Sequence, residues 1–413
     1  MTTAKRCGVS WRALLCLLSL LACLMALPHA AFAIDSEPTL TEAQAAIVED
    51  SAGNVLYARN PDAEINMASV TKIMTAVVAL ESGTPLDTVV TLSPPVLQEN
   101  AMVAGYQAGQ TSTLEDLLRV MLVRSANDAA YEVAVACSGS EQAFVQKMND
   151  KAAELGMTHT QFQNSHGLDA EGHYSSVSDL VTLGRYAMTN YPFISDTVRM
   201  SDVTVPIGGV ETSFHTVDSF VETYQGALGI KTGTGNNVTS FLGSARRDGV
   251  TLYACVLGCK TGAGRFSDTE SLMDWAFTNF DHYALANANA IVSVQPFAYH
   301  FGFSCVVTAD ASLTGLVWPD GGSTTWQGFA QPKGALLTPG DLVGAYTWSQ
   351  DGRTVGTATY SARAVLVPSR NGLGVLDEGT LARNYLVTRA VSATNTLPSN
   401  ANEAAAIASG RTI

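Results

Sequence analysis

Met67–Leu80, with the sequence MASVTKIMTAVVAL, is the stretch from which the fold and the chemistry of this chain can be read. It contains Ser69 and Lys72, whose spacing of nearly one helical turn puts both side chains on one face of a helix. The apolar residues that follow predict a buried helix. Burial lowers the pKa of an amine, and a neutral amine can accept a proton from a neighbouring hydroxyl. Taken alone, the segment could equally be an N-capping serine followed by a solvated lysine.

Length and composition predict an exported protein with two domains. The 413 residues exceed the size of one typical domain, and 46% of them are hydrophobic, which is enough for sizeable cores. A positive N-terminal region precedes the apolar segment 13–27, and Ala31–Ala33 is a small-x-small cleavage pattern. We therefore expect residues 1–33 to be a signal peptide. A lipoprotein signal with Cys23 as the lipidated residue ranks second.

The charge and the cysteines exclude several classes of function. Removal of the signal peptide takes the formal net charge from −14 to −17, and a chain this acidic is a poor nucleic-acid binder. Cys255 and Cys259 could form a disulfide only if the strand that carries them ends between them. Because no histidine pair accompanies them at zinc spacing, we expect no metal site. Four cysteines remain in the exported chain: Cys137, Cys255, Cys259 and Cys305.

Residues 34–286 alternate between strand and helix patterns. Besides the Ser69 helix, helices are expected at Thr113–Val123, Ala129–Ala136, Glu141–Leu155, Ser178–Thr189 and Phe266–Phe280. Strands are expected at Ala45–Glu49, Val55–Ala58, Asp202–Pro206, Phe214–Val217, Val238–Arg246 and Val250–Leu257. Arg247-Asp248-Gly249 is a tight-turn signal between the last two strands.

The pattern changes after about Asn287 to short strands separated by Gly, Pro and Asp turns. We expect a separate β-rich domain at 290–395 and expect residues 34–286 to fold without it. The segment 396–413 lacks the basic residues and the apolar face of an amphipathic membrane anchor, so we expect a mobile tail. The expected strands are Ile291–Val294, Cys305–Thr308, Leu313–Val317, Val343–Trp348, Thr354–Tyr360 and Arg363–Val367.

Two further motifs change the interpretation of Ser69. Ser125-Ala126-Asn127 lies at a predicted bend between helices, where it could simply cap the second helix. Lys231-Thr232-Gly233 precedes a predicted hairpin, where it could simply be a solvated strand start. Lys260-Thr261-Gly262 repeats the third motif, but no strand follows it to pair with it, so we interpret Lys260 as a surface loop lysine.

The three motifs in this order resemble those of the penicillin-binding protein and serine β-lactamase superfamily. The finer pattern is similar to the low-molecular-mass D-alanyl-D-alanine carboxypeptidases, and it spans roughly residues 45–280. The resemblance implies an α/β fold, an antiparallel sheet flanked by helices, followed by a small all-β domain. The segment Thr234–Asn237 departs from many relatives. The stretches that carry the resemblance are Ser69–Thr75, Arg124–Ala130, His166–Leu168, Gly172–Ser175, Gly229–Thr234 and Arg265–Asp268.

The resemblance also implies roles for three catalytic residues. Ser69 would be the nucleophile, and Lys72 would be its general base, neutral because it is buried near the second cation Lys231. Ser125 would relay the proton towards the nitrogen of the leaving D-alanine. No metal or organic cofactor is required for this chemistry.

The remaining roles concern substrate binding. Asn127 would bind a substrate amide and hold Lys72 in place. Lys231 would supply positive potential, while Thr232 and Thr234 would hold the terminal carboxylate and Gly233 would leave the backbone open to the peptide. The backbone N–H groups of Ser69 and Thr234 would form the oxyanion hole.

The expected function is that of a serine-type D-Ala-D-Ala carboxypeptidase. It would remove the terminal D-alanine from peptidoglycan stem pentapeptides in the cell envelope or as a secreted protein. β-Lactam antibiotics would be covalent inhibitors, nucleic acid is not an expected partner, and peripheral membrane or cell-wall association is left open. The alternatives are a DD-endopeptidase, a β-lactamase that uses Glu171 to hold a water, and a cell-wall-binding module without turnover.

Overall fold

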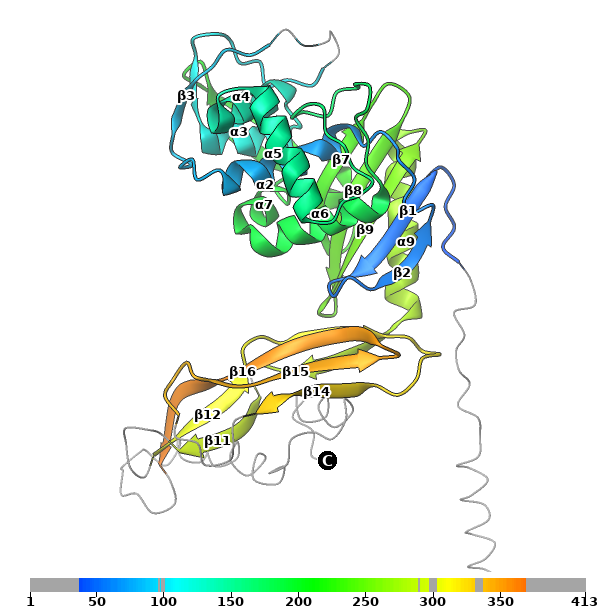
Figure 1. The fold of residues 1–413 in the computed structure, drawn as a ribbon, viewed down its shortest axis with the longest axis vertical. Helices are drawn as coiled ribbons and strands as arrows, with labels where there is room; N and C mark the ends of the chain where they lie inside the picture. Colours follow the sequence, from blue (N-terminus) through cyan, green and yellow to red (C-terminus); the bar gives the residue numbers. More distant parts are fainter. Residues whose placement is uncertain are drawn as a thin grey trace, which may run out of the picture.

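The chain is organised as two units joined at Phe280 (Figure 1). The computed structural model describes residues 37–95, 97, 101–288, 290–296, 303–330 and 337–368. The first unit comprises residues 37–280, and the second comprises residues 281–368. The predicted signal peptide at 1–33 and the predicted tail at 396–413 lie outside the described residues.

A five-stranded antiparallel sheet, in the order β2-β1-β9-β8-β7, forms the centre of the first unit. Its long strands are mostly buried, because helices cover both faces of the sheet. The predicted tight turn joins β8 to β9, and positive φ angles of 49° at Asp248 and 83° at Gly249 give it the twist that a hairpin needs. The strands are β1 (Ala45–Asp50), β2 (Val55–Arg59), β7 (Ala227–Thr234), β8 (Thr239–Arg247) and β9 (Val250–Cys259).

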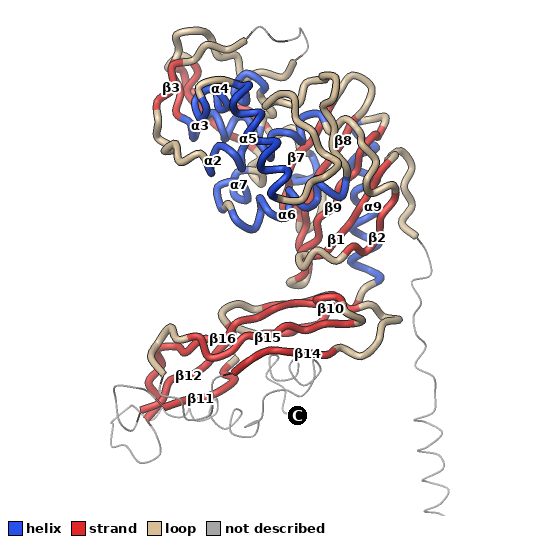
Figure 2. The backbone as a smooth tube through the Cα atoms, in the orientation of Figure 1, coloured by secondary structure: helices blue, strands red, loops and turns tan. Residues whose placement is uncertain are grey.

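The helices lie in two layers, with α2 to α6 on one side of the sheet and α9 on the other (Figure 2). The first layer packs the larger core against β9, and α8 and α9 pack a second core against the opposite face. The helices are α2 (Thr71–Glu81), α3 (Leu114–Val123), α4 (Asn127–Ser138), α5 (Glu141–Glu154), α6 (Val177–Asn190), α7 (Pro192–Thr197), α8 (Ser219–Thr223) and α9 (Gly262–Asn279). Two small hairpins border the helical layer: β3 (Val89–Thr91) with β4 (Thr111–Thr113), and β5 (Asp202–Ile207) with β6 (Val210–His215).

Side-chain caps set where several of these helices begin. Thr113 caps α3 by accepting the N–H of Asp116 at 3.1 Å, as its position before the apolar run predicts. The cap of α6 is Ser176 and not Ser178, because Ser176 reaches the N–H of Asp179 at 3.2 Å.

Two further helix starts differ from the prediction. α4 begins at Asn127 instead of Ala129, so the Asn127 side chain belongs to the first turn of that helix. α9 begins at Gly262, because Thr261 accepts the N–H of Gly264 at 2.9 Å and caps it. The predicted loop at Gly262–Gly264 is therefore the first turn of a helix.

The second unit is built from β-strands. One sheet has the order β11-β12-β16-β15-β14, and β10 pairs with β13 in a separate two-stranded sheet. The expected strands at 354–360 and 363–367 form the single strand β16, and β10 and β14 were not predicted. The strands are β10 (Asp281–Ala286), β11 (Ile291–Pro296), β12 (Phe303–Ala309), β13 (Leu313–Val317), β14 (Thr325–Ala330), β15 (Leu342–Gln350) and β16 (Arg353–Pro368).

The two units share a small apolar contact. Leu316 of β13 is buried in the core that α9 forms with the sheet. The rings of Phe280 and Trp318 meet edge to face with their centroids 5.2 Å apart. The side chain of Asn54 donates a hydrogen bond to the carbonyl oxygen of Thr354 at 2.6 Å.

Two sequence-based expectations bear on how the chain is anchored and cross-linked. Cys255 and Cys259 are buried free thiols on β9, which runs through both of them, so the break that a disulfide would need does not occur. Cys137 is also free, and the side chain of Cys305 lies outside the described part of the structure. None of the described helices combines the length and apolar content that a membrane crossing requires.

We predict that residues 34–280 fold without the second unit but with reduced stability. β10 pairs with β13, so both strands belong to the second unit. A truncation after Phe280 removes the two strands together, whereas a truncation after residue 286 would leave β10 without its partner. Loss of the packing by Leu316 and Trp318 should lower the free energy of unfolding by about 3 kcal/mol. Urea denaturation measures this loss, and Leu316→Ala in the full chain serves as the matched control. A truncated form that is folded yet loses over about tenfold in acylation rate would show that the second unit supports the active site.

Candidate active site

Ser69 and Lys72 meet where the chain turns into α2. Ser69 lies in a short 3-10 turn, η1 (Ala68–Val70), and Lys72 lies in the first turn of α2. The side-chain nitrogen of Lys72, Nζ, contacts Ser69 Oγ at 2.9 Å and Asn127 Oδ1 at 2.7 Å, and it also reaches the carbonyl oxygen of His166. The Lys72 side chain is fully buried, and this burial, together with the charge of Lys231, holds its pKa well below the usual value. The arrangement therefore places an amine whose charged form is disfavoured against the serine hydroxyl.

The bend that carries Ser125 and Asn127 is held by backbone contacts. Ser125 has a positive φ of 65°, which is uncommon for a residue other than glycine and stores local strain. The N–H of Asn127 donates to the carbonyl oxygen of Met102 at 2.8 Å. The buried Asp128 carboxylate accepts the backbone N–H groups of residues 104–106. These contacts fix the bend so that Asn127 reaches Lys72 from α4.

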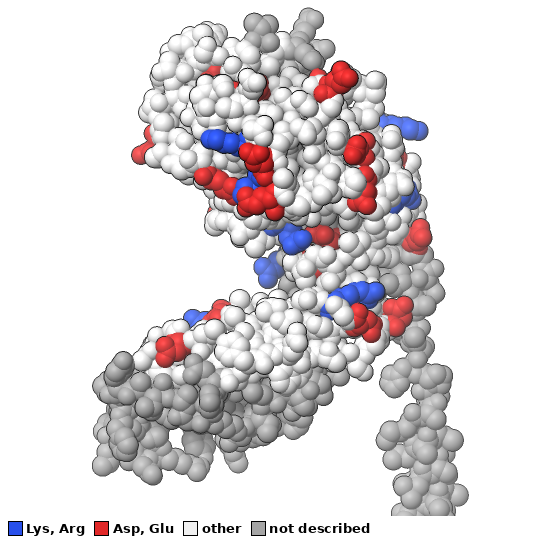
Figure 3. All heavy atoms as spheres, in the orientation of Figure 1, with Lys and Arg blue, Asp and Glu red and all other residues white. Residues whose placement is uncertain are grey.

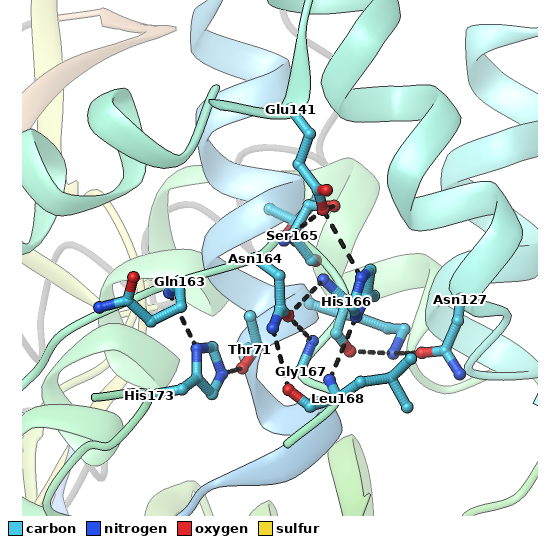
Figure 4. A network of polar contacts seen from close by, with 12 residues as sticks. Thr71, Asn127, Glu141, Gln163, Asn164, Ser165, His166, Gly167, Leu168 and His173 are labelled. Atoms are coloured by element: carbon cyan, nitrogen blue, oxygen red, sulfur yellow. Dashed lines mark hydrogen bonds and ion pairs between the residues drawn. The ribbon is translucent and has the colours of Figure 1, made fainter. Parts of the chain in front are cut away.

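A polar loop, residues 163–173, closes the other side of Lys72 (Figure 4). Asn164 Oδ1 accepts the N–H groups of His166 at 3.3 Å and Gly167 at 2.6 Å. Glu141 of α5 accepts both the N–H and the hydroxyl of Ser165, at 3.0 and 2.7 Å. This local network, whose members Glu141, Asn164 and Ser165 surround His166 in Figure 4, holds the loop so that the His166 carbonyl oxygen contacts the Lys72 amine.

Both histidines of this loop are neutral structural residues. His173 Nδ1 accepts the N–H of Gln163 at 3.0 Å, so Nε2 carries the proton and donates to Thr71 Oγ1 at 2.8 Å. Burial lowers the pKa of His166 to about 3 and that of His173 to about 4. Both histidines therefore fix the conformation of the loop, His173 through Gln163 and Thr71, and His166 through the N–H of Leu168. The described part of the chain holds no cluster of three His, Cys, Asp or Glu side chains suited to a metal ion.

Lys231 lies on β7 at the edge of the central sheet. Its side chain is buried, and its Nζ contacts the carbonyl oxygen of Thr232 at 3.1 Å and Thr232 Oγ1 at 3.4 Å. The pKa of Lys231 is lowered to about 7, chiefly by burial, which the Asp218 carboxylate opposes and the charge of Arg265 reinforces. A second buried amine that is half protonated near neutral pH therefore lies beside the Ser69 turn.

Gly233 lets the β7 strand pack directly on the turn that carries Ser69. A Cβ atom at this position would lie 2.5 Å from the Met67 carbonyl oxygen and 2.2 Å from Ser240 Oγ. Ser240 Oγ donates to that same carbonyl oxygen at 2.8 Å. Arg265 of α9 donates to the Gly233 carbonyl oxygen at 2.7 Å and contacts Thr234 Oγ1 at 3.0 Å. The guanidinium therefore lies behind the exposed Thr234 hydroxyl.

Two charged residues at this site received no role in the sequence analysis. Arg265 belongs to one of the stretches that resemble the family. The spacing of the motifs does not predict that its side chain approaches β7 from the far face of the sheet. Asp218 caps α8 and is buried near Lys231 and Arg265. A capping aspartate is readable from sequence, whereas its burial beside two cations depends on how α8 packs on β7.

The two residues considered as alternatives, Lys260 and Glu171, are exposed. Lys260 is exposed at the end of β9, and its N–H donates to Glu42 Oε2 at 3.0 Å. Glu171, the candidate for a β-lactamase-like water, is also exposed. The segment 234–237, whose sequence differs from that of many relatives, is joined to the polar loop by Asp169. The Asp169 carboxylate accepts hydrogen bonds from the Asn236 N–H at 3.2 Å and from the Asn66 side-chain amide at 2.7 Å.

Fold and site together define a serine enzyme of the penicillin-binding class, in which a buried amine lies against a serine hydroxyl. The D-alanyl-D-alanine carboxypeptidase family model matches residues 32–261, and the chain belongs to that family. A D-alanyl-D-alanine carboxypeptidase of Bacillus subtilis is 30% identical over 254 residues, which cover 60% of this chain and 65% of that protein. The predicted family, fold class and enzyme class are confirmed.

Two solved structures extend this comparison. The D-alanyl-D-alanine carboxypeptidase of Francisella tularensis matches over 84% of this chain and 98% of its own, with a TM-score of 0.60 and 20% identity, which shows a common fold including the second unit. Penicillin-binding protein D2 of Listeria monocytogenes, solved with cefotaxime bound, is 30% identical with a TM-score of 0.53 and covers 58% of this chain and all of its own.

We predict that Gly167→Ala disrupts the active site. Gly167 has a φ of 87°, and an added Cβ would lie 2.1 Å from the Ala68 carbonyl oxygen and 2.9 Å from the Ser69 nitrogen. The substitution should cost about 3 kcal/mol of folding stability and lower the rate of serine acylation at least about tenfold. Gly156→Ala is the matched control, because its φ of 73° carries similar strain with no atom within 4 Å. Equal losses in the two variants, by denaturation and acylation kinetics, would contradict the steric account.

Proposed function

We propose that this chain removes the terminal D-alanine from peptidoglycan stem pentapeptides through an acyl-enzyme on Ser69. The observation that carries the proposal is the 2.9 Å contact between Ser69 Oγ and a buried Lys72 amine whose pKa is strongly lowered. A neutral amine at this distance is a general base, and a partly exposed serine hydroxyl beside it is a nucleophile. The family match supports the same reaction class.

The proposed reaction has two steps. Ser69 Oγ attacks the carbonyl carbon of the penultimate D-alanine while its proton passes to Lys72 Nζ. The proton is relayed through Ser125 to the nitrogen of the terminal D-alanine, which leaves as an amine when the peptide bond breaks. Water then attacks the ester and gives a proton to Lys72, and Lys72 passes a proton to Ser69 Oγ as the ester bond breaks and the shortened peptide leaves. The N–H groups of Ser69 and Thr234 stabilise the oxyanion in both steps.

Local cations, and not the overall charge, would hold the negatively charged substrate. Acidic side chains are spread over the first unit on the face drawn in Figure 3, with single basic side chains between them. Lys231, with the hydroxyls of Thr232 and Thr234, would bind the terminal carboxylate, and Arg265 supports this group from behind. Gly233 would let the peptide approach β7, and Asn127 would bind a substrate amide.

The proposal extends to inhibitors and location. β-Lactams would acylate Ser69 covalently. The Listeria relative, which was solved with the β-lactam cefotaxime bound, supports this proposal. The substrate lies outside the cytoplasm, so the enzyme would act there, and the second unit would hold it at the wall or the membrane surface. Exposure of Glu171 argues against a β-lactamase that uses this residue to deacylate. Endopeptidase cleavage of cross-linked peptides would use the same residues.

We predict that Ser69→Ala abolishes both labelling by a fluorescent penicillin and alanine release. The substitution removes the only atom on which the proposed acyl-enzyme can form. Mass spectrometry of a stem pentapeptide should show the loss of one alanine with the parent enzyme and none with the variant. Ser195→Ala, which changes an exposed hydroxyl on α7, is the control and should behave like the parent. Persistent labelling of the Ser69→Ala variant would refute the proposed nucleophile.

A second prediction separates the two Lys-Thr-Gly motifs. Lys231→Ala should lower kcat/KM on a D-Ala-D-Ala peptide by about 100-fold or more, because a charge-assisted contact to the carboxylate is lost in a buried site. Lys260→Ala should leave kcat/KM unchanged, because Lys260 is exposed and lies outside the site. Steady-state kinetics on both purified variants measure this difference. Similar losses in both would mean that the wrong motif has been assigned to the site.

A further inference from the structure

A buried carboxyl group that the proposed reaction does not use lies beside the carboxylate-binding residues. Asp218 is only 5% exposed. Its Oδ1 accepts the N–H of Phe220 at 3.1 Å, whereas Oδ2 is buried without a hydrogen-bond partner in the described structure. A buried carboxylate with an unpaired oxygen is costly unless nearby positive charge compensates it. Its surroundings should therefore supply that charge.

The packing of α8 places Asp218 between two catalytic motifs. A Cβ atom added to Gly229 of β7 would lie 3.0 Å from Val221 Cγ2, and the ring of Phe220 packs on that of Phe241 with centroids 5.2 Å apart. On the other side, the N–H of Val217 donates to the carbonyl oxygen of Val123 at 3.4 Å, two residues before Ser125. The Asp218 segment is thus wedged between the end of α3 and the strand that carries Lys231.

The charged groups that face Asp218 from these elements are cations. Lys231 of β7 and Arg265 of α9 both act on its carboxyl group. Lys231 in turn faces Arg265, and its charge acts on Lys72 of α2. Glu222, on the same short helix as Asp218, is instead paired with His215 at 3.2 Å near the surface. Asp218 therefore supplies negative charge beside the buried side chains of Lys231 and Arg265.

The titration of this group of charges follows from its burial. Burial raises the pKa of Asp218 to about 6, and Lys231 opposes the rise. Burial lowers the pKa of Lys231 to about 7, and Asp218 opposes the fall. Above about pH 6 the carboxylate is ionised and favours the ammonium form of Lys231. Removing that negative charge would lower the pKa of Lys231 further, so Lys231 would lose its proton at a lower pH.

We propose that Asp218 is a positioning residue for carboxylate recognition, whose negative charge keeps Lys231 in the ammonium form that binds the terminal carboxylate of the substrate. The inference rests on the proposed function, because it deepens the role given to Lys231. Asp218 acts through Lys231 and does not touch the substrate. It thereby sets the upper pH limit of the reaction.

The test is the pH profile of Asp218→Asn in the full mature chain. Asparagine keeps the shape of the side chain and its ability to cap α8. We expect the alkaline limb of kcat/KM to move down by about one pH unit, with KM rising and kcat at saturation retained. Asp218→Ser, a second uncharged cap, should shift the limb equally. Asp179→Asn removes a carboxyl group of similar burial, which contacts His159 and Thr160, and should leave the limb in place.

A second readout separates this inference from the proposed function. Acylation by benzylpenicillin, which carries a carboxylate, should show the same shift, whereas acylation by its methyl ester should not. An unshifted limb in folded Asp218→Asn and Asp218→Ser, or an equal loss with acid and ester, would overturn the inference and leave the proposed function standing. A parent enzyme that is acylated but releases no alanine would overturn the peptidase proposal, and the penicillin profile would still decide the role of Asp218.

Discussion

The contact between the Lys72 amine and the Ser69 hydroxyl is the constraint on which the rest of the site depends. A lysine can be a base near neutral pH only if it is kept out of water, and Lys72 is fully buried. The two N–H groups of a neutral buried amine must still have acceptors, and Asn127 Oδ1 and the His166 carbonyl oxygen provide them, which leaves the lone pair for the Ser69 hydroxyl. The positions of α4 and of the polar loop therefore provide the hydrogen-bond acceptors that the buried Lys72 amine requires.

The central sheet supplies the second half of the site. β7 can lie against the Ser69 turn only because Gly233 has no side chain, and the strand then brings Lys231 within electrostatic range of Lys72. In this dry site the charge of Lys231 disfavours the charged form of Lys72 and so helps to keep the pKa of Lys72 low. Asp218 and Arg265 adjust this balance from the far side of β7. The base and the carboxylate-binding cation are thus tuned by one shared set of charges.

Local signals in the sequence account for what could be predicted. The Ser-x-x-Lys helix, the Thr113 cap and the Asp248-Gly249 turn depend on neighbouring residues, and the structure has all three. The pairing of β10 with β13 and the approach of Arg265 to β7 depend on residues far apart in the chain. Periodicity carries no information about such contacts. The sequence therefore could not predict which charged side chains meet, because tertiary packing decides those contacts.

The protonation state of Lys72 in the free enzyme tests the central claim most directly. The account holds that burial and the charge of Lys231 keep this amine neutral at pH 7, so that it can take the proton of Ser69. NMR titration of the isotopically labelled lysine amines, with Lys72→Arg used to assign the Lys72 resonance, reports that state without turnover. A Lys72 amine that is neutral at pH 7 and gains its proton only in acid is the predicted result. An amine that remains an ammonium well above pH 7 would contradict the account.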